Sequence, residues 1–240
     1  IGLCLLLTRE LNVEFIVIII LIALIYIRLY PKEKIQNAYE QIEILIPLFN
    51  ELNIKKRIPN TRGYAASPDY LFEIKNIIQD NTPNLILEAG SGVSTLIASY
   101  SLKKYGGGKI ISLDHEKLYA DKTKSELKKH DLEAYADVVH APLKKYDNNL
   151  IWYDIENIKE FDSIDLFIID GPPSNIAKNA RFPALPLMFD KMKKGTIIIL
   201  DDGRRKNEQD TILLWEQKYD SFRFNYINNS RGAYIIEKIS

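Results

Sequence analysis

The sequence has few of the residues that build covalent or zinc-based scaffolds. Its 240 residues include one cysteine, Cys4, and three histidines. A single cysteine excludes an internal disulfide, and no Cys/His cluster has the spacing of a zinc site. Lysine plus arginine and aspartate plus glutamate each number 32, so the formal net charge is +0. This balance gives no support to a nucleic-acid partner, and none is expected.

The N-terminal part carries one long apolar run. Residues 11–30 are almost wholly apolar, and a helix of this length spans about 30 Å, the thickness of a bilayer core. No A-x-A-like cleavage site follows the unbroken stretch 15–27, which favours a membrane-spanning or membrane-anchoring helix in residues 1–30. A buried core helix or a signal-peptide segment is the alternative. Basic residues are more numerous after the run than before it, which predicts a single-pass anchor with the catalytic domain in the cytoplasm.

Residues 31–66 are predicted to link this anchor to the rest of the chain. Pro31 is expected to end the first helix. Apolar residues at helical spacing, including Ile35, Tyr39 and Ile42, then predict an amphipathic helix over 32–52. This helix could be a stalk, a membrane-surface helix, a homodimer contact or a helix packed on its own domain. Loop 58–66 could fold over a nearby site as a lid, and its Tyr64 is a candidate substrate contact.

Residues 85–95 contain the most informative motif. An apolar run ends in Glu88, passes through Gly90 and Gly92, and enters a segment with helical periodicity. This pattern predicts a strand, a tight loop and a helix whose free N–H groups face a ligand. Thr95 stands where the dinucleotide pattern has a third glycine or alanine, which weakens an NAD assignment. Glu88 suits instead a ligand that carries a positive charge or hydroxyl groups.

Strands and helices are predicted to alternate over residues 67–240, which we expect to form one domain. Five strands are expected at 84–89, 109–114, 136–140, 165–170 and 196–200, and helices at 67–80, 93–105, 116–130, 175–193 and 208–219. Segment 142–161 is predicted to be an inserted hairpin or a substrate-side loop, and 221–227 with 233–238 a terminal antiparallel pair. The alternation predicts a doubly wound α/β fold with a mostly parallel sheet and ligands at the carboxyl ends of its strands.

Acidic residues stand at the ends of most of these strands: Glu88, Asp114, Asp170, and Asp201 with Asp202. Each alone could be a helix cap or a turn former. Asp114 follows Gly92 by 22 residues. An acidic strand end about 20 residues after the glycines meets a ribose hydroxyl in nucleotide-binding α/β folds. Together on one rim of a sheet, the acids indicate a ligand site.

With these residues, the chain resembles the class I S-adenosylmethionine-dependent methyltransferases. The resemblance rests on Glu88-Ala89-Gly90-Ser91-Gly92, on Asp114, and on Asp170 in the segment Ile-Asp-Gly-Pro-Pro, and it covers about residues 67–239. More narrowly, the chain is similar to the group often labelled methyltransferase 24 and, in its strand-end acids, to the catechol-type metal-dependent O-methyltransferases. The resemblance implies an enzyme with a Rossmann-like sheet of strand order 3-2-1-4-5-7-6, the last strand antiparallel.

The resemblance also implies which residues bind S-adenosylmethionine. The glycine loop with Glu88 would hold the methionine part, Asp114 the ribose hydroxyls, and residues after the third strand the adenine. The full implied set is Glu88, Gly90, Ser91, Gly92, Asp114, His115, His140, Ala141 and Asp170.

The predicted metal site consists of Asp170, Asp201 and Asp202. Adjacent strands would place these carboxylates on one rim, and hard oxygen donors suit Mg²⁺. Such an ion would bind a substrate hydroxyl and lower its pKa. Alternatively, Asp170 contacts the cofactor while Asp201 and Asp202 cap the following loop and helix.

Asp170 and Lys178 are the candidate catalytic residues. Lys178 is the nearest lysine after the fourth-strand acid, the region that supplies the general base in the catechol-type enzymes. Arg181 and Arg204 are candidates for holding an acidic or phosphorylated substrate.

The sequence therefore predicts a membrane-anchored S-adenosylmethionine-dependent methyltransferase that acts on oxygen with the help of Mg²⁺. A small-molecule, lipid-linked or glycan acceptor is the hypothesis that the anchor suggests. One alternative is metal-independent N- or carboxyl-methyl transfer, or aminopropyl transfer, on the same fold. The other is a catalytically silent, cofactor-binding membrane module.

Overall fold

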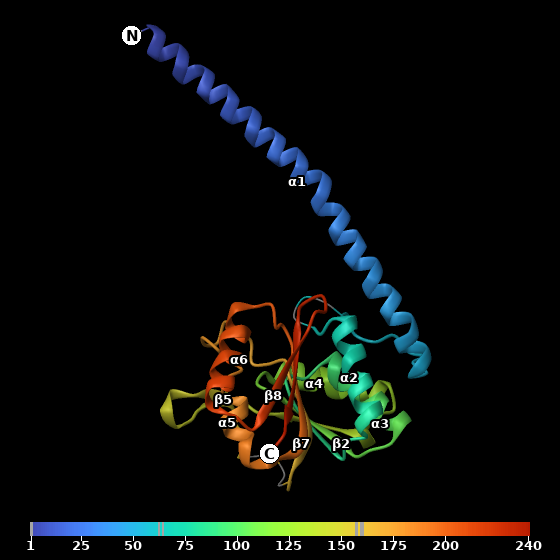
Figure 1. Cartoon of the computed structure of the whole chain (residues 1–240). Helices are drawn as coiled ribbons and strands as arrows, with labels where there is room; N and C mark the ends of the chain where they lie inside the picture. The colour runs from blue at the N-terminus through green and yellow to red at the C-terminus, as the bar shows by residue number, and fades with distance from the viewer. Residues whose placement is uncertain (1, 62, 64, 157, 159–160) are drawn as a thin grey trace. The chain divides into compact units, whose positions relative to one another are not determined.

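The computed structural model of the chain describes residues 2–61, 63, 65–156, 158 and 161–240. The chain divides into two compact units, Ile1–Glu43 and Ile44–Ser240. Helix α1 (Gly2–Glu51) supplies the described residues of the first unit and the first residues of the second (Figure 1). The second unit contains all the strands and the remaining helices that the structure describes.

Helix α1 continues through Pro31, so the predicted helix end at this residue is wrong. Proline removes one N–H donor, but its fixed φ near −65° is itself helical, and a long helix can lose a single hydrogen bond. Among the residues that the structure describes, Val13–Glu51 is the one stretch of helix long and apolar enough to cross a membrane. A signal sequence would meet the same criteria of length and composition.

A seven-stranded sheet forms the centre of the second unit. Its strands are β1 (Leu85–Ala89), β2 (Lys109–Asp114), β3 (Ala136–His140), β6 (Ile164–Ile169), β7 (Met192–Leu200), β8 (Phe222–Ile227) and β9 (Ala233–Lys238). Their order is β3-β2-β1-β6-β7-β9-β8, and β9 runs antiparallel to both of its neighbours. Without the two hairpin strands described below, this order is 3-2-1-4-5-7-6. The predicted fold class is confirmed.

Two apolar cores cover the two faces of the sheet. Successive strand residues belong to opposite cores, as Ile86 and Leu87 of β1 do, because side chains alternate along a strand. The first core contains residues of α2 (Pro68–Asn81), α3 (Val93–Tyr105) and α4 (Lys117–Lys129), and the second contains residues of α5 (Ala184–Met188) and α6 (Lys206–Lys218). Figure 1 shows α2 and α6 on opposite sides of the sheet.

The predicted insertion at 142–161 contains a hairpin. Strands β4 (Leu143–Lys145) and β5 (Ile151–Tyr153) pair antiparallel, with the 3-10 helix η2 (Asp147–Asn149) between them. Another short 3-10 helix, η1 (Glu133–Tyr135), precedes β3. Trp152 and Tyr153 are only 0% and 1% exposed, so the hairpin is packed into the second core.

The predicted helix over 175–193 is wrong. Residues 174–183 form turns, the five-residue helix α5 follows, and η3 (Phe189–Lys191) leads directly into β7. Pro183 and Pro186 account for the late start of the helix at Ala184, because proline is favoured in the first helical turn, where its N–H is not needed. Asn179 has a left-handed backbone with φ of 53°, which also interrupts a helix. The turns bring Arg181 to the ends of β6 and β7.

Candidate active site

The glycine loop after β1 lies between the ends of β2 and β6. The Gly90 N–H donates to the Leu113 carbonyl at 2.9 Å. Gly90 has φ of +103°, and a Cβ at this position would lie 3.3 Å from the Gly171 nitrogen. Glycine is therefore required by both conformation and space. A Cβ at Gly92 would meet nothing within 4 Å, so this side of the loop borders open space.

Glu88 stabilises the glycine loop through hydrogen bonds to side chains that contact the loop. It is 0% exposed, and its Oε2 accepts hydrogen bonds from the hydroxyls of Thr95 and, at 2.5 Å, Ser112. Thr95 in turn accepts the N–H of Gly92 at 3.0 Å. Burial raises the pKa of Glu88 to about 7, although the Ser112 and Thr95 hydroxyls act in the opposite direction. Among the described residues, Glu88 Oε1 has no hydrogen-bond partner.

Thr95 is a functional residue whose role the sequence interpretation missed. Its hydroxyl joins the loop nitrogen of Gly92 to the Glu88 carboxylate. The signal was present, because Thr95 occupies the third position of α3, from which a side chain can reach back to the N-cap backbone.

Asp114 ends β2 beside the glycine loop. It is 4% exposed, and its carboxylate accepts the Ser91 hydroxyl at 2.6 Å and the Glu116 N–H at 3.0 Å. Ser91 also lies within hydrogen-bond distance of the Thr123 hydroxyl. His115 Nδ1 is 3.9 Å from Asp114 Oδ1. Asp114 therefore fixes the loop and the end of β2 to each other.

The end of β3 lies next to Asp114. His140 pairs with Asp114 in the sheet register, and the Ala141 N–H donates to the Asp114 carbonyl at 2.7 Å. Ala141 is buried and His140 is exposed. The predicted cofactor residues of the first three strands thus come together at one edge of the sheet, and their contacts with a cofactor stay a prediction.

Asp170, Asp201 and Asp202 converge at the ends of β6 and β7. One carboxylate oxygen from each lies within 4.8 Å of the others. Asp170 has the most exposed side chain of the three. The Asp201 Oδ1 accepts the Asp202 N–H at 2.7 Å, and in the part of the chain that the structure describes its Oδ2 has no partner.

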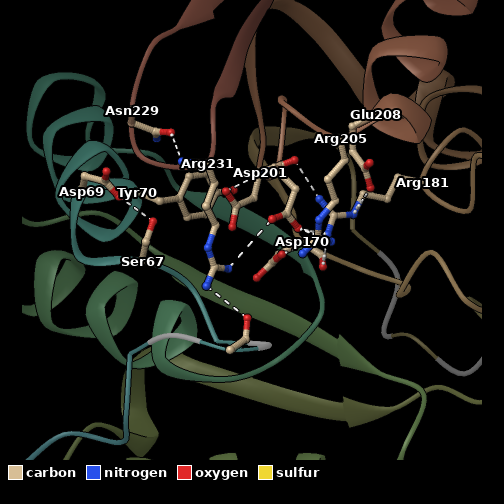
Figure 2. A network of polar contacts seen from close by, with 12 residues as sticks. Ser67, Asp69, Tyr70, Asp170, Arg181, Asp201, Arg205, Glu208, Asn229 and Arg231 are labelled. Atoms are coloured by element: carbon tan, nitrogen blue, oxygen red, sulfur yellow. Dashed lines mark hydrogen bonds and ion pairs between the residues drawn. The ribbon is translucent and has the colours of Figure 1, made fainter. Parts of the chain in front are cut away.

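Arg181 lies inside this acid cluster, with only 3% of its surface exposed (Figure 2). Its guanidinium donates to Asp170 Oδ1 at 3.1 Å and to Asp202 Oδ2 at 2.8 Å. It also donates to the carbonyls of Asp170 and Asp201, both at 2.8 Å. Its Nε lies 3.6 Å from Glu208 Oε1. The sequence assigned Arg181 to an acidic substrate; the structure places it among the chain's own acids, and a substrate contact stays a prediction.

Two further arginines approach Asp202. Arg205 Nη1 lies 2.7 Å from Asp202 Oδ2, and Arg231 Nη1 lies 3.9 Å from Asp202 Oδ1. Arg231 also donates to the Gly63 carbonyl at 3.1 Å. Arg204, the predicted substrate contact, is exposed and donates to Asn228 at 2.9 Å. The sequence interpretation missed Arg231 because it is 29 residues from Asp202 in the chain, and no local pattern joins them.

Burial and mutual repulsion perturb the acids of the cluster. Burial, followed by the charges of Asp201 and Asp202, raises the pKa of Asp170 well above its usual range, while Arg181 and Arg231 oppose the rise. Burial and then the Asp202 charge raise the pKa of Asp201 to about 6. Perturbed carboxylates at the end of a parallel sheet are typical of a functional site.

Of the remaining predicted site residues, Lys178 has no recorded contact with the acids of the cluster in the described structure. Lys178 is exposed in the turn segment 174–183, and its role as a general base stays a prediction. Tyr64 lies outside the described residues. Tyr153 does approach the cluster's strand ends, because a Cβ on Gly171 would lie 2.2 Å from its hydroxyl. Any side chain at position 171 would clash with Tyr153, which explains why a glycine follows Asp170.

The residues of the cluster do not fit a dedicated Mg²⁺ site. Arg181 already donates to one oxygen each of Asp170 and Asp202, and Arg205 shares the same oxygen of Asp202. A divalent cation bound between these carboxylates would lie beside a guanidinium in a buried place, where like charges repel strongly. The acids fit the arginine side chain that they already contact.

The sheet order, the antiparallel last strand and the glycine loop after β1 define the class I S-adenosylmethionine-dependent methyltransferase fold. The glycine loop and the acid at the end of β2 fit that cofactor, because the loop borders open space at Gly92 and Asp114 lies beside it.

Comparisons with known proteins agree with this class. Residues 87–203 match a family model, methyltransferase group 24, described as a methyltransferase domain. No curated protein sequence matches the chain. Residues 87–203 thus form an S-adenosylmethionine-dependent methyltransferase domain.

Solved structures share the fold at low sequence identity. An O-methyltransferase from Bacillus cereus in complex with SAH is 16% identical, with a TM-score of 0.59 over 82% of this chain and 90% of that chain. An SAH-bound methyltransferase from Podospora anserina is 14% identical, with a TM-score of 0.59 over 82% and 88%. An O-methyltransferase from Streptomyces achromogenes involved in tomaymycin synthesis, in complex with SAM, is 11% identical, with a TM-score of 0.58 over 84% and 90%.

Proposed function

We propose that the chain transfers a methyl group from S-adenosylmethionine to an oxygen of a small-molecule acceptor. The observation that carries this proposal is the position of the glycine loop, which lies directly against the end of β6, where Asp170 begins the acid cluster. The cofactor supplies an activated methyl group. The transfer then requires mainly an aligned acceptor and the exclusion of water.

The chain's residues divide between holding the cofactor and orienting the acceptor. The glycine loop, supported by Glu88 and Thr95, would hold the methionine part of the cofactor, and Asp114 would accept its ribose hydroxyls. His115, His140 and Ala141 would line the base. Asp170 is the acid with the most exposed side chain, so it is the member of the cluster best placed to touch the cofactor or the acceptor.

The role of metal separates two versions of the reaction. Mg²⁺-assisted O-methylation is what the three carboxylates suggest from sequence, whereas the Arg181 contacts favour transfer without a metal. Metal-independent N- or carboxyl-methyl transfer, or aminopropyl transfer, would use the same cofactor site. A catalytically silent module is less favoured, because a module without chemistry has no need of several buried acids at its cofactor edge.

We also propose that residues 1–30 anchor the chain in a membrane, that 31–66 link the anchor to the enzyme, and that 67–240 form the cytoplasmic methyltransferase domain. The described apolar side chains of 13–29 support the anchor, since Phe15 and Ile27 are 64% and 65% exposed. An anchored enzyme would meet a lipid-linked or glycan acceptor at the membrane surface. The linker helix is a candidate homodimer contact.

Calorimetry of the full chain in detergent with S-adenosylhomocysteine tests the cofactor site. We expect binding, and we expect Asp114→Ala to weaken it by about tenfold to a hundredfold, the usual effect of losing a hydrogen bond to a charged group. Asp137→Ala is the matched control, because Asp137 pairs with Lys109 away from the loop and should bind like the wild type. Absence of binding to the intact chain would disprove the proposed function.

Membrane fractionation tests the anchor. The full chain is expected to sediment with membranes and to be released by detergent. Ile18→Asp combined with Ile22→Asp should shift it to the soluble fraction, because a central charge costs about 2.5–3.5 kcal/mol on insertion. Leu118→Asp is the control, as Leu118 is also exposed but belongs to α4. A soluble full chain without detergent would contradict the anchor.

A further inference from the structure

The buried guanidinium of Arg181 connects the ends of β6 and β7 (Figure 2). One nitrogen, Nη2, lies within hydrogen-bond distance of Asp170 Oδ1 and Asp202 Oδ2. The other, Nη1, donates to the Asp201 carbonyl. A guanidinium is always charged in proteins, and its donors have a fixed planar geometry. Arg181 therefore joins two strand ends and offsets their negative charge, as a divalent cation would.

Glu208 gives independent evidence that this cation is a built part of the site. Glu208 is 2% exposed and comes from α6, outside the three acids that could hold a metal. Its Oε1 faces the Nε of Arg181 at 3.6 Å. A buried acid is costly unless it is paired. Glu208 contacts the guanidinium and does not belong to the group of acids that could bind a metal. It therefore stabilises the buried charge of Arg181 and not that of a metal ion.

The charges of the site leave little attraction for a divalent cation. The site has four acids, Asp170, Asp201, Asp202 and Glu208. All of them except Asp201 form ion pairs with the three arginines Arg181, Arg205 and Arg231. Even with every acid ionised, one negative charge remains in excess. A divalent cation would reverse the sign of this buried site, and desolvated like charges repel strongly.

From these contacts we infer that the guanidinium of Arg181 takes the place of a divalent cation between β6 and β7, and that methyl transfer by this chain is metal independent. The inference rests on the proposed function. Arg181 is then a positioning residue: it holds the carboxylate and the carbonyl of Asp170 at the edge of the cofactor loop.

Electron paramagnetic resonance of Mn²⁺ tests the inference on the full chain in detergent. The wild type is expected to leave the free Mn²⁺ signal unchanged. Arg181→Gln uncovers the carboxylates of Asp170 and Asp202, so it should bind Mn²⁺ at least tenfold more tightly than the wild type. Arg205→Gln should increase the Mn²⁺ affinity less than Arg181→Gln does, because the Arg205 side chain is 46% exposed and solvent already weakens its charge. Arg204→Gln is the matched control and should give none, since Arg204 contacts Asn228 instead.

Two results would overturn the inference. The first is Mn²⁺ binding by the wild type that Asp202→Asn removes. The second is an unchanged Mn²⁺ affinity in both Arg181→Gln and Arg205→Gln. If Arg181→Gln does not fold, the wild type and Arg205→Gln decide. Calorimetry with S-adenosylhomocysteine, in EDTA and in Mg²⁺, accompanies each sample. Equal affinity for S-adenosylhomocysteine in EDTA and in Mg²⁺ supports the inference. Absence of cofactor binding would count against the proposed function and not against the role of Arg181.

Discussion

Arg181→Gln is expected to lower the free energy of unfolding by about 3–5 kcal/mol, because it leaves buried carboxylates without their cation. The side chain is 3% exposed and contacts Asp170, Asp202 and Glu208. For a domain of this size, the loss corresponds to a fall in melting temperature of about 10 °C. Urea unfolding of the full chain in detergent, followed by circular dichroism, measures it.

Arg205→Gln provides a matched control for burial. Arg205 contacts the same Asp202 oxygen as Arg181, but its side chain is 46% exposed. Exposed ion pairs contribute at most about 1 kcal/mol. Arg181→Gln should therefore lower the free energy of unfolding severalfold more than Arg205→Gln does. Equal costs would show that the Arg181 contacts contribute no more than a surface pair.

Glu88→Gln is expected to stabilise the protein at pH 8 and to leave its stability nearly unchanged at pH 4. Burial raises the pKa of Glu88 from 4.5 to about 7 in the folded protein. A raised pKa means that the unfolded chain ionises first. The stabilisation that neutral Glu88 provides is therefore complete below about pH 4.5 and is lost as the pH rises through 7. The difference between the pKa values of Glu88 in the unfolded and folded protein corresponds to about 3 kcal/mol in the free energy of unfolding.

Urea unfolding at several pH values between 4 and 8 measures this effect. The wild type should lose stability over this interval more steeply than Glu88→Gln, whose amide stays neutral and whose oxygen can still accept from Ser112 and Thr95. Glu133→Gln, a change at an exposed acid in η1, should follow the wild-type curve. Parallel curves for the wild type and Glu88→Gln would contradict an elevated Glu88 pKa.

The strands and the cofactor edge could be predicted from the sequence because both depend on local patterns. Apolar runs that end in Glu88, Asp114 and Asp170 mark strands and their carboxyl ends, and the sheet gathers such ends at one edge. The predicted bounds of α3 and of β2 and β3 equal those observed.

The environment of Arg181 could not be predicted, because it depends on long-range packing. Arg181 lies 11 residues from Asp170 and 21 from Asp202, in a segment whose composition resembles a helix. Two prolines shorten that helix, and the resulting turns decide where the side chain points. The Pro31 prediction failed for the opposite reason, since a local helix breaker was overridden by helix-forming sequence on both sides, apolar before Pro31 and amphipathic after it.

The two contacts of Arg231 connect Gly63 to the acid cluster. Arg231 donates to the Gly63 carbonyl and lies beside Asp202. A ligand that displaced Gly63 would remove one of the two contacts that hold this guanidinium. If a ligand at Gly63 changed the affinity of the acid cluster for a second ligand, the second ligand would change the affinity at Gly63 by the same factor. The position of Gly63 and ligand binding at the cluster would then form one coupled equilibrium.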